Sequence, residues 1–253
     1  MVRMTREPSA QDARGQQGSS SIEQPTYWWY RARTDLLRAA LGDYLGTPDR
    51  VLDVGSADGP SVGWMSGRQR FAIDLDPRGL RPGTGVCASA LALPFADESF
   101  DVVGAFDVIE HCEPEGQAVD ELARVLRPGG RLLASVPAYA WAWSDHDVRA
   151  GHYRRYTRPR IVRAVEAAGF EVLRASYGFT SVFPMFAAER VARRVRGAKP
   201  LESGGLMRLP VPVESALLRL SKVDAWLLRR QDLPFGSSVF VAAEKVGTHR
   251  EVS

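Results

Sequence analysis

Three histidines and their acidic neighbours are the side chains in this sequence best suited to proton transfer. His111 lies alone, whereas His146 and His152 lie in a segment that also contains Asp145 and Asp147. An imidazole with a pKa near about 6.5 can accept a proton from a hydroxyl nucleophile, and a carboxylate beside it can orient the ring. We therefore predict these three histidines as candidate catalytic bases and favour His111. The alternative for His111 is that it only bonds main-chain groups of a turn.

The segment 137–156 carries aromatic and cationic side chains around two of those histidines. Aromatic rings can cover an organic acceptor, and arginines can bind a phenolate, carboxylate or phosphate. With the aromatic residues near the N-terminus, the predicted acceptor-binding set is Trp28, Trp29, Tyr139, Trp143, Tyr153, Arg154 and Arg155. Two alternatives stay open: aromatic residues that pack the sheet, and Asp–Arg ion pairs that hold the segment together. No metal is predicted, because His146, Asp147 and His152 lack the dense spacing of a metal site.

The ends of two predicted strands are expected to point at one ligand. Residues 51–60 form a short apolar run that ends in small residues, which let a ligand approach the backbone, and a helix is expected to start near Pro60. Residues 71–76 form a second apolar run ending in Asp74 and Asp76, about 20 residues further on, where a carboxylate can meet ribose hydroxyls. The pattern favours a nucleotide-type site, although a strand and glycine turn also occur without a cofactor.

These residues resemble the class I S-adenosylmethionine-dependent methyltransferases. The first family motif is matched by Asp53, Gly55 and Gly59, with Ala57 in place of the middle glycine. Residues 92–103 and 126–133 resemble the later family motifs that lead into the fourth and fifth strands. The resemblance covers about residues 50–136. The overall pattern resembles the broad group that includes the quinone-biosynthesis and secondary-metabolism methyltransferases.

The resemblance implies an α/β fold: a Rossmann-like seven-stranded sheet with helices on both faces and an antiparallel last strand. It also implies S-adenosyl-L-methionine as cofactor and S-adenosyl-L-homocysteine as product. The cofactor-binding residues it implies are Asp53, Gly55, Ser56, Ala57, Gly59, Asp74, Leu75, Ser89, Ala90, Leu91 and Phe106, with Arg31 near the cofactor carboxylate. Ser89 stands where the family usually has an acid.

Periodicity and turn residues outline the other elements. A helix is expected around 37–45, and strands at 84–88, 100–106, 131–136, 170–177 and 237–245. A helix over 120–126 should end at Gly129 and Gly130, and Thr157 should cap the next helix. Residues 1–24 are expected to be a disordered arm, and 25–253 a single domain. Within that domain, 180–234 is a helical insertion that could form a lid, a homodimer contact or a peripheral membrane contact.

Composition limits the class of protein. Among 253 residues the formal net charge is only +3, which gives no support for nucleic-acid binding, and two cysteines cannot form a disulfide framework. We see no signal peptide and no apolar run near the roughly 18 residues of a membrane span, so a cytoplasmic location is expected. The predicted function is O-methylation of a small or medium organic acceptor in bacterial biosynthesis. The alternatives are C- or N-methylation, a non-catalytic cofactor-binding scaffold, and a nicotinamide dehydrogenase.

Overall fold

The computed structural model describes residues 26–55, 63–195 and 209–247. Its centre is a seven-stranded sheet in the order β3-β2-β1-β4-β5-β7-β6. The strands are β1 (Arg50–Val54), β2 (Gln69–Asp74), β3 (Gly85–Cys87), β4 (Phe100–Phe106), β5 (Leu126–Pro137), β6 (Phe170–Gly178) and β7 (Ser238–Lys245). Only β7 runs antiparallel to its neighbours β5 and β6. The predicted fold, including the antiparallel last strand, is confirmed.

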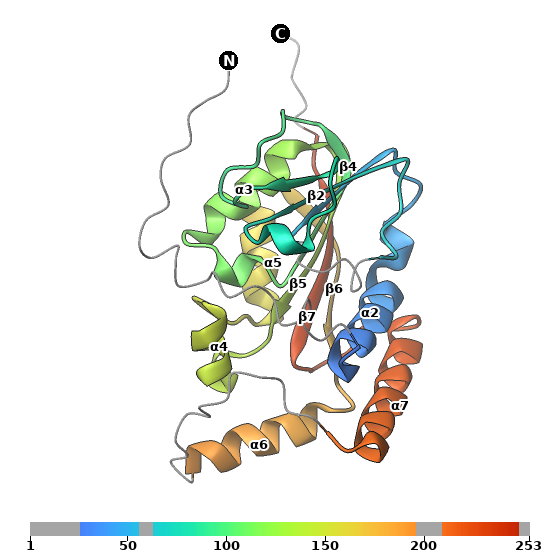
Figure 1. Ribbon diagram of the computed structural model, residues 1–253, viewed down its shortest axis with the longest axis vertical. Helices are drawn as coiled ribbons and strands as arrows, with labels where there is room; N and C mark the ends of the chain where they lie inside the picture. Colours follow the sequence, from blue (N-terminus) through green and yellow to red (C-terminus); the bar gives the residue numbers. More distant parts are fainter. Residues whose placement is uncertain (1–25, 56–62, 196–208, 248–253) are drawn as a thin grey trace.

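Helices cover both faces of this sheet. They are α2 (Trp28–Leu41), α3 (Glu115–Val125), α4 (Asp145–Ala150), α5 (Arg158–Ala167), α6 (Phe183–Val195) and α7 (Val211–Leu228). Figure 1 shows α2 and α7 on one side of the sheet and α3 and α5 on the other. The central strands β1 and β4 are therefore buried almost throughout, which agrees with their mainly apolar sequences.

The aromatic residues near the N-terminus belong to α2, which starts earlier and ends earlier than the predicted helix at 37–45. Trp28 and Tyr30 are buried, and the face that continues through Leu36 and Leu37 joins the main core. A short 3-10 turn, η2 (Gly42–Tyr44), follows the helix. Trp28 thus packs the protein interior, and its assignment to acceptor binding is wrong.

Gly129 and Gly130 do not end a helix as predicted. Helix α3 stops at Val125, and Leu126 already pairs with Phe100 of β4, with a register shift before the regular pairing begins at Arg131. Because Leu126 is buried in the core, the chain leaves the helix at that residue, and the two glycines lie in an irregular first part of β5.

The segment 137–156 contains more regular structure than predicted. A 3-10 turn, η6 (Ala140–Ala142), precedes α4, whose first turn is closed by a capping box between Ser144 and Asp147. The next helix, α5, begins after Thr157 as expected, but the Thr157 side chain makes no capping hydrogen bond.

The insertion before β7 is helical, as predicted, and its two helices differ in environment. Helix α7 packs along α2, whereas α6 has no buried residue. No helix in the described ranges is long and apolar enough to cross a membrane. The predicted arm at 1–24, the helix start near Pro60, and Ser56, Ala57 and Gly59 lie outside the described residues.

Candidate functional site

The carboxyl ends of β1 and β4 meet where the strand order reverses, which is where open α/β sheets bind ligands. Gly55 follows β1 with a φ of 73°, a conformation that favours glycine. A Cβ atom at Gly55 would lie 2.5 Å from Cγ2 of Val108, in the turn after β4. Glycine therefore lets two chain segments approach closely at this edge.

The predicted ribose-binding residue, Asp74, ends β2 beside this point. Its carboxylate accepts a hydrogen bond from the Asp76 amide at 2.8 Å. The next side chain, Leu75, is apolar yet 67% exposed. An acid followed by an exposed apolar surface suits a ribose and its base, so both predictions are compatible with the geometry.

The chain after β3 runs close to Asp74. The Ala88 amide donates to the Asp74 carbonyl, and the Ser89 hydroxyl accepts from the Leu91 amide at 3.2 Å. Ala90 and Leu91 are half-buried. Ser89 therefore shapes a turn beside the end of β2. Contact of Ser89, Ala90 and Leu91 with the cofactor stays a prediction.

Two other predicted cofactor residues serve the core instead. Asp53 is buried inside β1, and its carboxylate pairs with Arg70 of β2 at 3.0 Å. Phe106 is buried at the end of β4 and packs against Trp64. A buried, paired carboxylate fixes neighbouring strands, so we assign Asp53 to the sheet rather than to ligand contact.

Arg33, the second arginine of α2, lies at this edge of the sheet. Arg31 is exposed, whereas Arg33 is buried and pairs at 2.7 Å with Asp107, the residue after β4. Ser135 of β5 donates to the same carboxylate at 3.0 Å. Asp107 is thereby held at the carboxyl edge by groups from α2 and β5. Arg33 is thus the α2 arginine that bonds Asp107, and a contact of Arg31 with the cofactor carboxylate stays a prediction.

His152 is the histidine that the structure orients most firmly. Its Nδ1 atom lies 2.8 Å from Oδ1 of Asp147, and Arg155 bonds both oxygens of that carboxylate. Burial opposes ionisation of Asp147, but the bonds from His152 and Arg155 outweigh it and hold its pKa below the usual 3.8. An ionised carboxylate only accepts, so Nδ1 of His152 donates to Asp147 and Nε2 is the other ring nitrogen.

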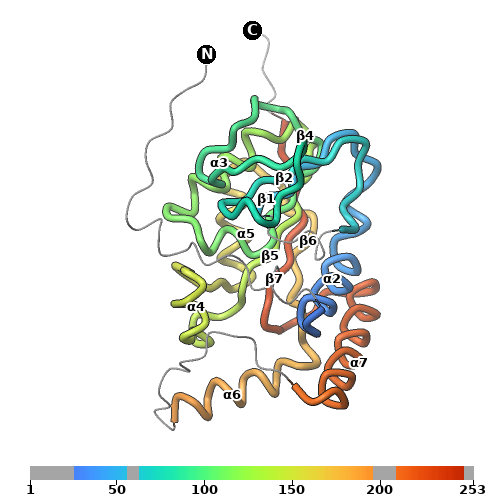
Figure 2. Tube along the Cα trace, viewed as in Figure 1, coloured from blue at the N-terminus to red at the C-terminus, as the bar shows by residue number. Residues whose placement is uncertain are grey.

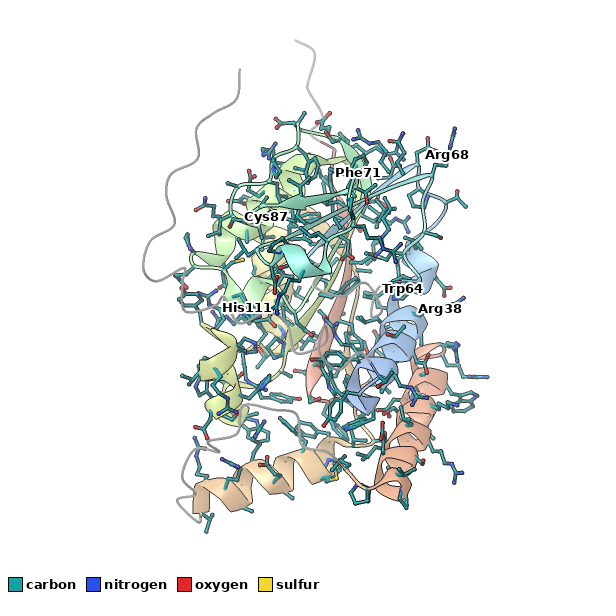
Figure 3. The ribbon with its side chains drawn as sticks, viewed as in Figure 1. Arg38, Trp64, Arg68, Phe71, Cys87 and His111 are labelled. Carbon is teal, nitrogen blue, oxygen red and sulfur yellow. The ribbon has the colours of Figure 1, made fainter. Side chains whose placement is uncertain are left out.

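His111 lies next to His152, in the turn η5 (Ile109–His111), with ring centroids 4.6 Å apart. Figure 3 labels His111 and shows it on the side of the molecule that carries α4. Desolvation, followed by the nearby His152, lowers the pKa of His111 from 6.5 to about 4, while a bond to the Ala150 backbone acts the other way. His111 is thus neutral at pH 7, and its main-chain bond agrees with the alternative drawn from the sequence.

His146 is exposed on α4, and its ring centroid lies 6.1 Å from that of His152. Desolvation also lowers its pKa. Asp145, one of the two acids expected to orient a histidine, pairs instead with Arg193 of α6 at 3.2 Å. The structure therefore brings together His111 and His152 and leaves His146 beside them without such a carboxylate partner.

Sequence reasoning missed Glu110, which is fully buried between these groups. Neither of its carboxyl oxygens has a hydrogen-bond partner in the part of the chain that the structure describes. One such oxygen and one ring nitrogen each of His111 and His152 lie within 4.8 Å of one another. This trio differs from the metal set weighed on the sequence. The available signal was a carboxyl next to His111, in the turn that follows a central strand.

Arg154 and Arg155, predicted to hold an acceptor anion, are occupied by the protein itself. Arg154 pairs with Glu113 and donates to the Cys112 carbonyl, and Arg155 joins Asp147 to the Ala138 carbonyl. These are the internal clamps that the sequence left as an alternative, so both assignments to acceptor binding are corrected. Tyr153, in contrast, is 53% exposed.

Aromatic rings form a wall beyond the end of β5. Tyr139, at a φ of 62°, stacks on Tyr177 at 14° and on Trp141 at 23°. Burial, followed by the hydrogen bond with Tyr177, raises the pKa of Tyr139 to about 12. Trp141 and Trp143 are 41% and 38% exposed. This wall offers flat apolar surface beside the histidines.

Trp29 does not belong to that wall. Its ring stacks on Phe179 at 6°, with centroids 5.7 Å apart, and Arg33 lies over it. It therefore joins α2 to the end of β6 and supports the arginine that holds Asp107.

Comparison with known proteins agrees with this fold. A family model for a methyltransferase domain matches residues 52–134. A probable S-adenosylmethionine-dependent methyltransferase of Mycolicibacterium smegmatis is 31% identical over 176 residues, covering 65% of this chain and 67% of that protein. An uncharacterized methyltransferase of Mycolicibacterium vanbaalenii is 35% identical over 114 residues, covering 41% and 45%.

A solved structure of similar fold is the 1,6-didemethyltoxoflavin-N1-methyltransferase of Burkholderia thailandensis, determined with its namesake compound and S-adenosylhomocysteine bound. It has a TM-score of 0.53 and 20% identity, and the match covers 90% of this chain and 85% of that one. At this identity the likeness concerns the fold alone.

The fold, with the tight turn at Gly55 after β1, defines a Rossmann-like methyltransferase domain. The chain belongs to the class I S-adenosylmethionine-dependent methyltransferases, whose cofactor is S-adenosylmethionine. It spans 45% to 67% of the length of the first curated relatives it matches.

Proposed function

We propose that the protein transfers a methyl group from S-adenosylmethionine to an oxygen of a small or medium organic acceptor at the carboxyl edge of the sheet. The observation that carries this proposal is the Asp147–His152 pair, because it presents an oriented imidazole base beside the expected methyl-donor site. A bacterial biosynthetic pathway for secondary metabolites, quinones or lipids is the context we infer.

The described residues fit the cofactor. Gly55 keeps the edge open, Asp74 supplies a carboxylate for ribose hydroxyls, and Leu75 supplies exposed apolar surface for a base. When bound, S-adenosylmethionine supplies a methyl group activated by its sulfonium charge. The protein then has to bind both partners, align them and accept a proton.

The aromatic wall and the histidines support an acceptor with a flat apolar part and a hydroxyl. Tyr139 and Trp141 offer ring surface, and the high pKa of Tyr139 keeps its own hydroxyl protonated. Nε2 of His152 accepts the acceptor proton, while the Asp147 carboxylate stabilises the resulting imidazolium. His111 keeps a neutral ring next to it, which avoids a second positive charge.

The test is methyl transfer from labelled S-adenosylmethionine to a panel of phenols and hydroxy acids, followed as labelled product and S-adenosylhomocysteine. We expect His152→Ala and His152→Gln to lower kcat about 10² to 10⁴-fold with cofactor affinity retained. Asp147→Asn should also lower kcat and alter the pH profile. The exposed Val148→Ala, on the same helix, is the matched control.

Near-wild-type kcat in both His152 variants would contradict the base assignment. Loss of wild-type turnover in a chelator, restored by a divalent cation, would also contradict it, because Glu110, His111 and His152 would then be ligands. Methylation of amines or carbon acids alone would overturn the choice of oxygen. No turnover with any acceptor, despite cofactor binding, would favour the non-catalytic scaffold.

A further inference from the structure

Helix α6 shows its apolar side to solvent. Met185, Val191 and Val195 are 52%, 55% and 81% exposed, and Pro184 and Ala188 are exposed as well. At about 100° per residue these five fall on one side of the helix, and no charged residue lies among them. A surface helix normally turns such a stripe toward the core. The opposite side of α6 also carries aromatic residues, among them Phe183, which contacts Tyr139 and Trp141, so the exposed stripe is a second apolar side that the described residues do not cover.

The charged residues of α6 lie on its other side, toward α4. Arg193 pairs with Asp145 of α4 at 3.2 Å and with Glu189 at 3.6 Å. Arg190 pairs with Glu189 at 3.0 Å and lies over the Phe186 ring. These contacts fix the side of α6 that faces α4 and leave the apolar stripe exposed.

A cavity of about 200 Å³ separates α6 from the η6–α4 segment. It is lined by Trp141, Trp143, Ser144, Asp145, Arg190, Arg193 and Arg194. The acids facing its three arginines are Asp145 and Glu189, so one positive charge is left over. Nε of Arg190 is buried without a hydrogen-bond partner among the described residues. The cavity is suited to an anionic group.

We propose that α6 binds the surface of an anionic phospholipid membrane and that the arginine-lined cavity takes a lipid phosphate. A helix in the membrane interface buries its apolar face at the acyl boundary and keeps its polar face at headgroup level. Here the polar face is the side that lies toward the protein body, which is also where the arginines and the cavity lie. The two features of α6 therefore match one partner.

The neighbouring surface extends the same face. Figure 2 shows α6 across one end of the molecule with the start of α7 at that end. Val211 and Val213, in the first turn of α7, are 74% and 41% exposed. The cavity shares Trp141 and Trp143 with the aromatic wall, but neither Asp147 nor His152 lines it, and the vesicle test below does not depend on the proposed reaction.

A second copy of the chain fits this surface less well. In a two-fold dimer the exposed apolar stripe would face its own copy. The arginines lie on the other side of α6, so the surplus positive charge of the cavity would stay without a counter-charge, whereas a lipid phosphate supplies one.

Vesicle flotation tests the proposal on the full chain. We expect binding to vesicles of equal parts phosphatidylglycerol and phosphatidylcholine to be at least about tenfold stronger than binding to phosphatidylcholine alone. Because this difference is electrostatic, most of the binding should be lost in roughly 0.5 M salt. Arg194→Gln should weaken binding about fivefold. Val191→Asp should weaken it about tenfold or more, because it removes apolar surface and adds a repelled charge.

Val246→Asp and Arg68→Gln are the matched controls, since both residues are exposed elsewhere, and both variants should bind as the wild type does. All mutated side chains are exposed, and circular dichroism checks their folding. Equal binding to both vesicle types, or no effect of Val191→Asp and Arg194→Gln, overturns the proposal. A wild-type dimer that Val191→Asp converts to a monomer, without vesicle binding, overturns it in favour of a second copy.

Discussion

Glu110 and His111 are neighbours in the chain, and the protein environment favours the neutral form of each. Burial, followed by the charge of Asp107, raises the pKa of Glu110 well above its ordinary 4.5, whereas desolvation lowers the pKa of His111 to about 4. Both shifts therefore act toward the uncharged form, at the edge where the methyl donor is expected.

The substitution Glu110→Gln should stabilise the fold increasingly as pH rises. The folded wild type holds the Glu110 proton to higher pH than the unfolded chain, so this group's contribution is present below about 4.5 and is lost as pH rises toward the folded pKa. Glutamine has no proton to lose. Urea unfolding at pH 5 and pH 8 measures the difference, with the exposed Glu166→Gln as control. A larger gain at pH 5 than at pH 8 would contradict it.

The sequence could not decide which of several similar side chains reaches a given partner, and one physical cause accounts for this. Arg31 and Arg33 are equally basic in the sequence, but they lie about 200° apart around α2, and only the packing of the helix decides which one reaches Asp107. In the same way, Arg155 became a clamp because the fold brings Asp147 and the Ala138 carbonyl to it. Residue type indicated which chemistry was available, but long-range contacts decided its use.

At the scale of elements, the two insertion helices have different roles. Helix α7 is part of the folded core, because Leu217, Ala225 and Leu228 are buried against the body of the protein. Helix α6 is joined mainly by ion pairs and aromatic contacts. Replacing the whole insertion would therefore expose the surface of α2, and only α6 remains a candidate for a cover over the acceptor.

Asp224 anchors α7 to the start of the insertion. Its buried carboxylate accepts hydrogen bonds from the Ser181 amide at 3.1 and 3.0 Å. We expect Asp224→Ala to lower the free energy of unfolding by about 1 to 3 kcal/mol, because the amide loses its acceptor. Asp224→Asn keeps an acceptor and should cost less, and the exposed Lys222→Ala should have little effect. Chemical denaturation measures all three variants. An unchanged free energy of unfolding in Asp224→Ala would contradict the anchoring role of Asp224.

Local sequence signals were reliable for elements with strong local patterns. The strand at 100–106 and the antiparallel strand near 237–245 followed from apolar runs, and both are found within one residue of their predicted bounds. The start of β5 did not, because Leu126 joins the sheet only through its pairing with Phe100. Likewise α4 was not predicted, because it is only six residues long and depends on the Ser144–Asp147 capping box instead of an apolar periodicity.

At the scale of the whole molecule, the sheet order decides where the chemistry lies. Strand β1 pairs with β2 on one side and β4 on the other, so Gly55, Asp74 and the turn after β4 meet at one edge although up to about 50 residues separate them. The family resemblance predicted this edge correctly. The acceptor side could not be predicted as well, because it is built from segments outside the matched residues 52–134.

Calorimetric titration with S-adenosylhomocysteine tests the central claim, that this edge binds the methyl donor, most directly. We predict saturable binding by the wild type and a loss of about 1 to 3 kcal/mol, roughly 5- to 150-fold in Kd, in Asp74→Ala, because a carboxylate bonded to ribose hydroxyls makes charge-assisted contacts. The exposed Asp120→Ala should bind as the wild type does. Absence of binding by the wild type at millimolar ligand, or unchanged affinity in a folded Asp74→Ala variant, would contradict the account.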